Sequence, residues 1–131
     1  MVVGGCAIDI TASITQSKGH SLHGTTHPGT VESALGGVGL NIARTLARLS
    51  SPDTAPSLVS AVGSDSHANQ VISGVQQSGI LTTDGTLTRL PNERTAVVSL
   101  ILGADGQLVS GVADMGISER ISPAHIERSI I

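Results

Sequence analysis

The stretch Gly36-Gly37-Val38-Gly39-Leu40-Asn41 carries the strongest fold signal in the chain. Adjacent glycines let a second backbone or a ligand approach closely, and the first turn of a helix leaves N–H groups free to bind oxygen atoms. Apolar residues then recur at helical spacing over 42–49, which predicts a helix that begins at the glycines. Asn41 offers both a donor and an acceptor, as sugar hydroxyls require. The structural alternative is a glycine-rich turn before a helix with a surface Asn.

Outward from these glycines, short apolar runs alternate with helical patterns. The expected elements are a buried strand over 2–10, a loop or short exposed edge strands over 11–30, the glycine-started helix, a loop over 50–57, a buried strand over 58–62, a helix capped by Asp65 or Ser66 and ended by Gly79, a β-hairpin over 95–112 that turns at 103–106, and a helix from Ser122. Strands that alternate with helices predict an α/β fold with a largely parallel sheet.

Asp9 closes the first expected strand. A carboxylate can accept hydrogen bonds from two neighbouring hydroxyl groups, and ligands of α/β proteins gather at the carboxyl ends of strands. Asp9 is therefore a candidate ligand for a polyhydroxyl substrate. The alternative is a solvated strand-end Asp or a helix cap.

Composition narrows the classes of partner. The 131 residues suit one domain or a piece of a larger one, and they include no Phe, Trp or Tyr on which a nucleic-acid base could stack. A net charge of -3 with only 7 Lys and Arg residues argues against a nucleic-acid partner. The sequence has no apolar run of membrane-spanning length and no secretory signal. We expect a soluble, cytoplasmic protein in which the lone Cys6 is a buried apolar residue, not a nucleophile.

Two weaker signals lead to alternatives. His20, His23 and His27 share one segment, which we interpret as a surface loop and not as a metal site, because no second ligand cluster accompanies them. The glycines at 36, 37 and 39 also resemble a dinucleotide-binding fingerprint, but Ile42 stands where a third small residue is needed. A dinucleotide-binding domain is the least favoured alternative.

Taken together, the stretches around Asp9, Gly36–Ala43, Val62–Asp65 and Thr95–Val98 resemble the PfkB family of carbohydrate kinases. The resemblance implies a ribokinase-like three-layer α/β/α sandwich with a small β lid. Residues 1–131 would form its N-terminal, substrate-binding part, with lid segments at about 11–35 and 95–112. A homodimer formed through the lid is the expected self-association. A free chain should also expose an unpaired sheet edge and an open apolar face, which predicts marginal stability.

The resemblance also implies roles for individual residues. Asp9 and the side chain of Asn41 would hold sugar hydroxyls, and the backbone of Gly36 and Gly37 would contact the sugar. Thr95 begins a strand that completes the substrate site. A sixth candidate substrate ligand is Asp114, because 113–115 resembles a stretch of pseudouridine-kinase-like members, some of which are fused to a glycosidase.

The family's second signature, a Gly-Ala-Gly-Asp segment that supplies the general base and an anion hole, does not occur in this sequence. No catalytic, ATP-binding or metal-binding residue is therefore assigned here, and ATP and Mg²⁺ are implied only for a full-length parent. The expected function is part of a kinase that transfers the ATP γ-phosphate to a sugar or nucleoside hydroxyl, with pseudouridine as the best single substrate and no activity alone. The alternative is a non-catalytic sugar-binding or interaction module from a truncated gene.

Overall fold

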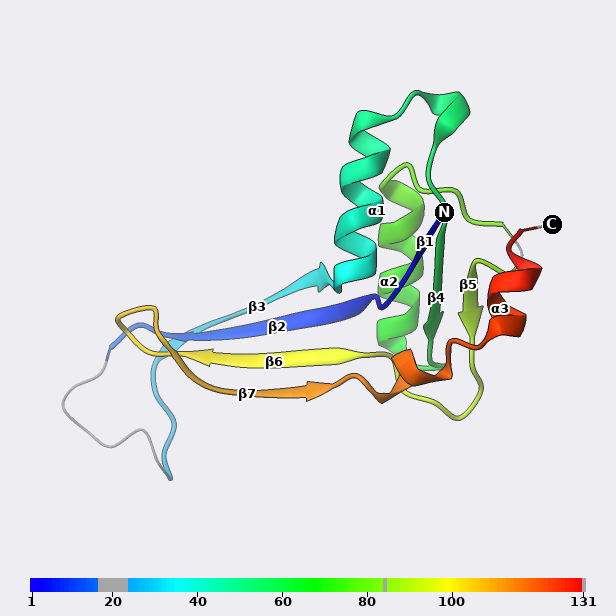
Figure 1. The fold of residues 1–131 in the computed structure, drawn as a ribbon. Coiled ribbons are helices and arrows are strands. Elements are labelled where there is room, and N and C mark those ends of the chain that lie inside the picture. The colour runs from blue at the N-terminus through cyan, green and yellow to red at the C-terminus, as the bar shows by residue number, and fades with distance from the viewer. Residues whose placement is uncertain (17–23, 84, 131) are drawn as a thin grey trace.

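A computed structural model describes residues 1–16, 24–83 and 85–130 of the chain (Figure 1). In chain order the elements are β1 (Val2–Val3), β2 (Ala7–Ile14), β3 (Gly29–Gly36), α1 (Val38–Leu49), the 3₁₀ helix η1 (Pro52–Thr54), β4 (Leu58–Val62), α2 (Ser66–Gln77), β5 (Leu87–Arg89), β6 (Val97–Leu102), β7 (Leu108–Asp114), the 3₁₀ helix η2 (Gly116–Arg120) and α3 (Pro123–Arg128).

The strands form two sheets. A three-stranded sheet has the order β1-β4-β5 with parallel pairing, as expected for an α/β fold. A four-stranded sheet has the order β3-β2-β6-β7 and projects sideways from the helices as an arm (Figure 1). Within this arm β2 and β6 run parallel, and β3 and β7 pair antiparallel on either side of them. The arm occupies the place in the chain where the sequence predicts lid segments.

The expected single strand over 2–10 is wrong. The strand β1 ends at Val3, and β2 begins at Ala7 in the other sheet. The chain crosses between the two sheets at Gly4 and Gly5, where Gly4 lies against the helix glycine Gly39. Asp9 is consequently the third residue of β2 and not the end of a strand.

The segment expected as loop or short edge strands over 11–30 also differs from the prediction. The strand β2 continues to Ile14, and β3 begins at Gly29 as an eight-residue exposed edge strand. In the part of this segment that belongs to β2, Thr11 and Ser13 alternate with apolar residues. Because β2 pairs with β3 on one side and with β6 on the other, its backbone N–H and C=O groups have hydrogen-bond partners even without apolar cover. The hairpin turn at 103–106 is confirmed, since Gly103 N–H donates to Gln107 O at 2.8 Å.

Both long helices begin and end as their sequence signals predict. Gly37 is the N-cap of α1, and Asp65 caps α2 by accepting a hydrogen bond from Ala68 N–H at 3.0 Å. Gly79 follows the C-cap of α2 with φ 70°, a conformation that favours glycine. Arg44 joins the two helices by donating to Ser78 Oγ at 3.2 Å.

Aliphatic side chains make up most of the core, which contains no Phe, Trp or Tyr. One face of β4 packs with α1, α2 and the base of β2, and the buried members of this cluster are Cys6, Ile8, Leu40, Ala43, Leu58, Val62, Ala68, Val71, Val75 and Ile80. On the opposite face, Ala61 of β4 packs with Ile117 of η2. The sheet therefore has helical cover on both faces, which is the expected layered arrangement. The short strand β5 was not predicted.

Some apolar surface stays open among the described residues. Neither β1 nor β5 pairs with a strand on its outer side. One side of α1 exposes Val38 at 76% and Leu49 at 80% of their surface. These features match the expected open edge and apolar face, and marginal stability stays a prediction. None of the described helices has both the length and the apolarity to span a bilayer.

We predict that Gly37→Ala destabilises the fold more than Gly79→Ala, although both glycines have positive φ. A Cβ at position 37 would lie 2.6 Å from Gly5 O and 2.7 Å from Cys6 Cα, whereas a Cβ at position 79 meets nothing within 4 Å. The expected losses of unfolding free energy are about 2–4 kcal/mol for Gly37→Ala and about 1 kcal/mol for Gly79→Ala. Urea denaturation measures both, and equal losses would contradict the packing role of Gly37.

Candidate functional site

The backbone crossing between the two sheets positions the candidate site. A Cβ on Gly39 would lie 2.7 Å from Gly4 C, so the first turn of α1 sits directly on the crossing. Leu40 N–H donates to Gly5 O at 3.3 Å and fixes the helix start against the same backbone. The glycines of both segments are therefore explained by backbone packing, whether or not a ligand also binds there.

Asp9 and Gly36 lie in contact at the base of the arm. A Cβ on Gly36 would overlap the Asp9 carboxylate, so only glycine at this position leaves room for that side chain. Asp9 is half-buried, and it takes part in neither ion pair found among the described residues. Its carboxylate oxygens are thus held beside the Gly36-Gly37 backbone at the start of α1.

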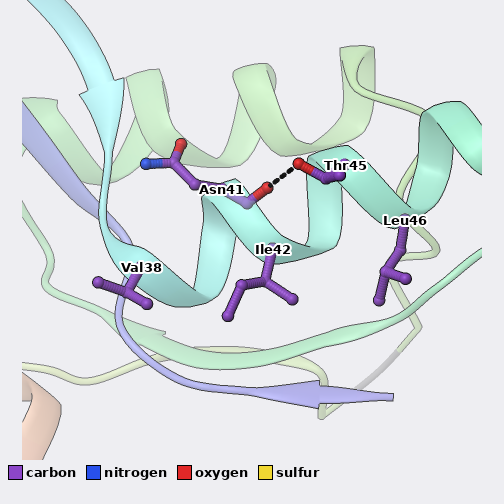
Figure 2. Close-up of a pocket in the computed structure, with 5 residues that line it drawn as sticks. All are labelled: Val38, Asn41, Ile42, Thr45 and Leu46. Atoms are coloured by element: carbon purple, nitrogen blue, oxygen red, sulfur yellow. Dashed lines mark hydrogen bonds between the residues drawn. The ribbon is translucent and has the colours of Figure 1, made fainter.

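Asn41 lies one turn into α1 and is exposed. Its backbone is engaged, since its N–H donates to Gly37 O at 3.0 Å and its carbonyl accepts from Thr45 Oγ1 at 2.9 Å. The side-chain amide projects on a different side of the helix from Val38 and Ile42 (Figure 2). A hollow of about 450 Å³ runs along α1, and its lining is mostly apolar: Val38, Asn41, Ile42, Thr45 and Leu46. This hollow suits an apolar partner better than a sugar, whereas the amide of Asn41 makes no side-chain hydrogen bond to another described residue and could bind a polar ligand.

The arm has two faces, and the register assigns each residue to one of them. Directly paired residues place their side chains on the same face. One row contains Ala34, Asp9, Val98 and Ala113, and the adjacent row on the opposite face contains Leu35, Ile8, Val97 and Asp114. The side chain of Leu35 reaches α2 at Gly74, so its face turns toward α2 at the base of the arm. We call the two surfaces the Asp9 face and the Leu35 face.

Asp114 is thereby separated from Asp9, because it lies on the Leu35 face. Its carboxylate forms an ion pair with Arg94 at 2.7 Å, and Arg120 pairs with Glu93 at 3.2 Å beside it. These four side chains help to line a charged hollow of about 490 Å³. Exposed ion pairs of this kind contribute little stability. The structure does not bring Asp114 together with Asp9.

Thr95 is buried and belongs to an internal network. Its hydroxyl donates to Asp65 Oδ1 at 2.7 Å and accepts from Gly63 N–H at 3.0 Å, and its own N–H donates to Asp65 Oδ2 at 2.8 Å. The network ties the end of β4 and the N-cap of α2 to the segment that leads into β6. Thr95 therefore holds the arm in place, and its hydroxyl is already engaged within the protein.

The same network sets the charge state of Asp65. Burial raises the pKa of this carboxyl, but the hydrogen bonds from Thr95 and Ala68 and the charge of His67 outweigh burial, so the pKa lies below its ordinary value. Asp65 is thus an anion held by three backbone or hydroxyl donors. The sequence indicates that Asp65 is a helix cap. Its hydrogen bonds to Thr95 could not be predicted from neighbouring residues, because Thr95 lies thirty positions away.

Two further expectations concern Cys6 and the histidines. Cys6 is buried, with Sγ 3.3 Å from Ser60 Oγ, and burial raises the pKa of the thiol. This agrees with an apolar core residue and not with a nucleophile. His20 and His23 lie outside the described residues, and His27 is half-buried just before β3.

Comparisons with known proteins identify the family and the fold. The sequence pattern of the pfkB family carbohydrate kinases matches residues 1–126. A pseudouridine kinase from Escherichia coli is 30% identical over 126 residues, which cover 96% of this chain and 38% of that protein. A ribokinase structure from Giardia lamblia superposes with a TM-score of 0.75 at 19% identity, over 96% of this chain and 36% of the other. A ribokinase from Cryptococcus neoformans var. grubii serotype A, solved in complex with ADP, gives a TM-score of 0.63 at 26% identity, over 86% and 32% of the two chains.

The fold is therefore that of the ribokinase-like kinases, with α/β layers and a projecting β arm. The chain belongs to the PfkB family of carbohydrate kinases. It spans less than two-fifths of the length of the pseudouridine kinase that it matches. The match favours the kinase interpretation over a dinucleotide-binding domain.

We predict that Thr95→Val lowers the unfolding free energy by about 2–3 kcal/mol, because it leaves the buried Gly63 N–H without its partner and removes one of the two hydrogen bonds to Asp65 Oδ1. Thr30→Val, at an exposed position of the edge strand β3, is the control and should change stability little. Urea denaturation checks both variants. Unchanged stability of Thr95→Val would mean that the hydroxyl serves a ligand and not the fold.

We also predict a pH-dependent difference for Asp65→Asn. A carboxyl whose folded-state pKa is lowered stabilises the fold above its unfolded-state pKa of about 3.9, and this stabilisation is lost as the pH falls through the folded-state value. The wild type should therefore lose stability steeply below about pH 4, and Asp65→Asn should be less stable at pH 7 but decline less on acidification. Chemical denaturation across pH 3–7, with Asp53→Asn as an exposed control, measures this. Parallel curves for wild type and Asp65→Asn would rule it out.

Proposed function

We propose that this chain carries the acceptor-binding part of a kinase that transfers the γ-phosphate of ATP to a hydroxyl of a sugar or nucleoside. The observation that supports it most is the contact between the Asp9 carboxylate and Gly36. This contact puts the carboxylate oxygens beside the backbone at the start of α1, so that an acceptor hydroxyl could reach both. The lid segments in this proposal are the two hairpins of the arm, β2-β3 and β6-β7.

Each residue of this site has a distinct chemical task. Asp9 accepts hydrogen bonds from one or two acceptor hydroxyls. The backbone of Gly36 and Gly37 lets the sugar ring approach the start of α1 without steric conflict. Asn41, with its side-chain amide directed away from the apolar side of α1, donates and accepts at a further hydroxyl (Figure 2). Together these groups orient the acceptor, which is a large part of catalysis in phosphoryl transfer.

Thr95 and Asp114 have a different place in the proposal. Thr95 supports the site through Asp65 and is not proposed as a direct ligand, since its hydroxyl is engaged. Asp114 on the Leu35 face is not proposed as a partner of Asp9 for one small acceptor.

The remaining machinery lies outside this chain in our proposal. ATP, its Mg²⁺, the general base and the anion hole would be supplied by the part of the kinase domain that the relatives have beyond the matched residues. ATP supplies the transferred phosphoryl group, and the residues described here only hold the acceptor. Without the base and the charge-stabilising groups, the chain alone should have almost no kinase activity. A non-catalytic sugar-binding module would have the same acceptor site and no need of ATP.

Pseudouridine is the acceptor that we propose as the first to test, because the pseudouridine kinase relative matches nearly the whole chain. A cytoplasmic location belongs to the same proposal and fits a buried free thiol at Cys6.

A second copy of the chain is the partner that we propose for the arm. The Leu35 face exposes Val31 at 73%, Val112 at 70% and Ile101 at 42% of their surface. Three exposed β-branched side chains on one side of a sheet form an apolar surface that a second arm can cover.

The acceptor site predicts that Asp9→Asn loses most of the affinity for pseudouridine and ribose. An uncharged amide replaces the acceptor carboxylate without changing its size, so binding should weaken about tenfold or more. Isothermal titration calorimetry on the folded chain measures this, with Asp105→Asn at the tip of the arm as the matched control. Equal affinities of the Asp9 and Asp105 variants would contradict the proposed site.

The arm interface predicts that Val31→Glu together with Val112→Glu abolishes self-association. Charges placed on that surface would have to be buried against the same charges of the second copy. Sedimentation velocity across a concentration series gives the mass of each form. As a control, Thr30→Glu places a charge on the other side of the same strand. A wild type that is monomeric at every concentration would exclude the dimer.

A further inference from the structure

The Asp9 face of the arm continues outward in a second row of side chains. The row containing Asp9 is followed, two residues farther along each strand, by a row that contains Glu32, Thr11, Leu100 and Gly111. Two residues of a β-strand advance about 7 Å, so the second row lies about one ring's width beyond the first. A single sugar ring held at Asp9 does not reach across both rows.

Contacts at two glycines confirm which way these side chains point. The Asp9 carboxylate lies where a Cβ on Gly36 would be, and Leu100 Cδ2 lies 2.9 Å from where a Cβ on Gly111 would be. Gly36 and Gly111 have no side chain of their own, so the side chains of Asp9 and Leu100 extend over them on the same face. The opposite face carries Leu35, which contacts α2 at Gly74.

The two rows together form a surface with a polar half and an apolar half. Asp9 and Thr11 on β2, with Glu32 on β3, form the polar half, and Val98 and Leu100 on β6 form the apolar half. Glu32 is exposed, and the other four are half-buried. Small residues at the margins, such as Ala34 and Ala113, leave the surface shallow and open. No cationic side chain belongs to either row.

This pattern matches a planar heterocycle with N–H groups on its edge. Such a ring can lay an apolar face on aliphatic side chains while its edge donates to a carboxylate. The chain has no Phe, Trp or Tyr for stacking, so Val98 and Leu100 are the apolar platform of this surface. A free sugar has hydroxyls around the whole ring and would leave this aliphatic pair unmatched.

We infer that Glu32 determines specificity for a nucleoside over a free sugar, by accepting a hydrogen bond from a ring N–H of the base. The inference rests on the proposed acceptor site, because the ribose must be held at Asp9 for the base to reach the second row. Leu100 supports the face of the base, and Thr11 offers a hydroxyl between the two carboxylates. The acidic, cation-free surface favours a neutral base with N–H donors and disfavours an anionic one.

Calorimetric titration of the whole chain with pseudouridine, 1,3-dimethylpseudouridine and ribose tests the inference. The wild type should bind pseudouridine about tenfold more tightly than ribose, because a hydrogen bond to a charged group and the aliphatic contact are added. The dimethylated ligand keeps the ribose and lacks both ring N–H groups, so it should lose most of this gain. Glu32→Gln should weaken pseudouridine about fivefold to tenfold and leave ribose unchanged. Glu127→Gln on α3 is the matched control.

The outcomes separate this inference from the proposed function. If ribose and pseudouridine bind the wild type equally and Glu32→Gln changes neither, the inference is wrong and the acceptor site stands. If a folded wild type binds neither ligand, the acceptor site itself is wrong. Leu100→Ser tests the aliphatic contact from β6, a different strand from that of Glu32. It should weaken the binding of pseudouridine more than the binding of ribose.

Discussion

Backbone contact between two pairs of glycines is the constraint on which the candidate site depends. Gly4 and Gly5 cross from the three-stranded sheet to the arm, and Gly37 and Gly39 begin α1 directly on that crossing. Side chains at these positions would force the helix start and the crossing apart. Because α1 sits so close, the end of β3 and the Asp9 carboxylate meet at one place. The acceptor site that we propose is a consequence of this packing.

The second constraint is the anion at Asp65, which links the α/β layers to the arm. It caps α2 and binds both the N–H and the hydroxyl of Thr95. Two of the attachments of the arm are therefore the glycine crossing at β2 and the Asp65 network before β6. In the proposed site, these attachments would hold the substrate groups of the arm at a fixed distance from the start of α1.

Local signals predicted much of the fold, and they pointed to Asp9 and Gly36, which the structure brings into contact. The start of α1 after its glycines, the Asp65 cap of α2 and the turn at 103–106 each leave a signal within a few neighbouring residues, so the sequence reveals them directly. The break after Val3 escaped prediction because it accompanies the close approach of Gly4 to Gly39, a residue far away in the sequence. The separation of Asp114 from Asp9 depends on the register of the strand pairing, because a shift of one residue would move every side chain of a strand to the opposite face of the sheet. The burial of Thr95 likewise depends on a partner far away in the sequence.

The most direct test of the central claim is to locate the ligand by NMR. Titration of the ¹⁵N-labelled chain with pseudouridine should shift the amide signals of Gly36, Gly37 and Asn41 at the start of α1. A site built on the glycine crossing predicts that these signals move together and that the charged hollow around Arg94 stays unchanged. Shifts centred on Arg94 and Asp114, with none at the glycines, would contradict the account.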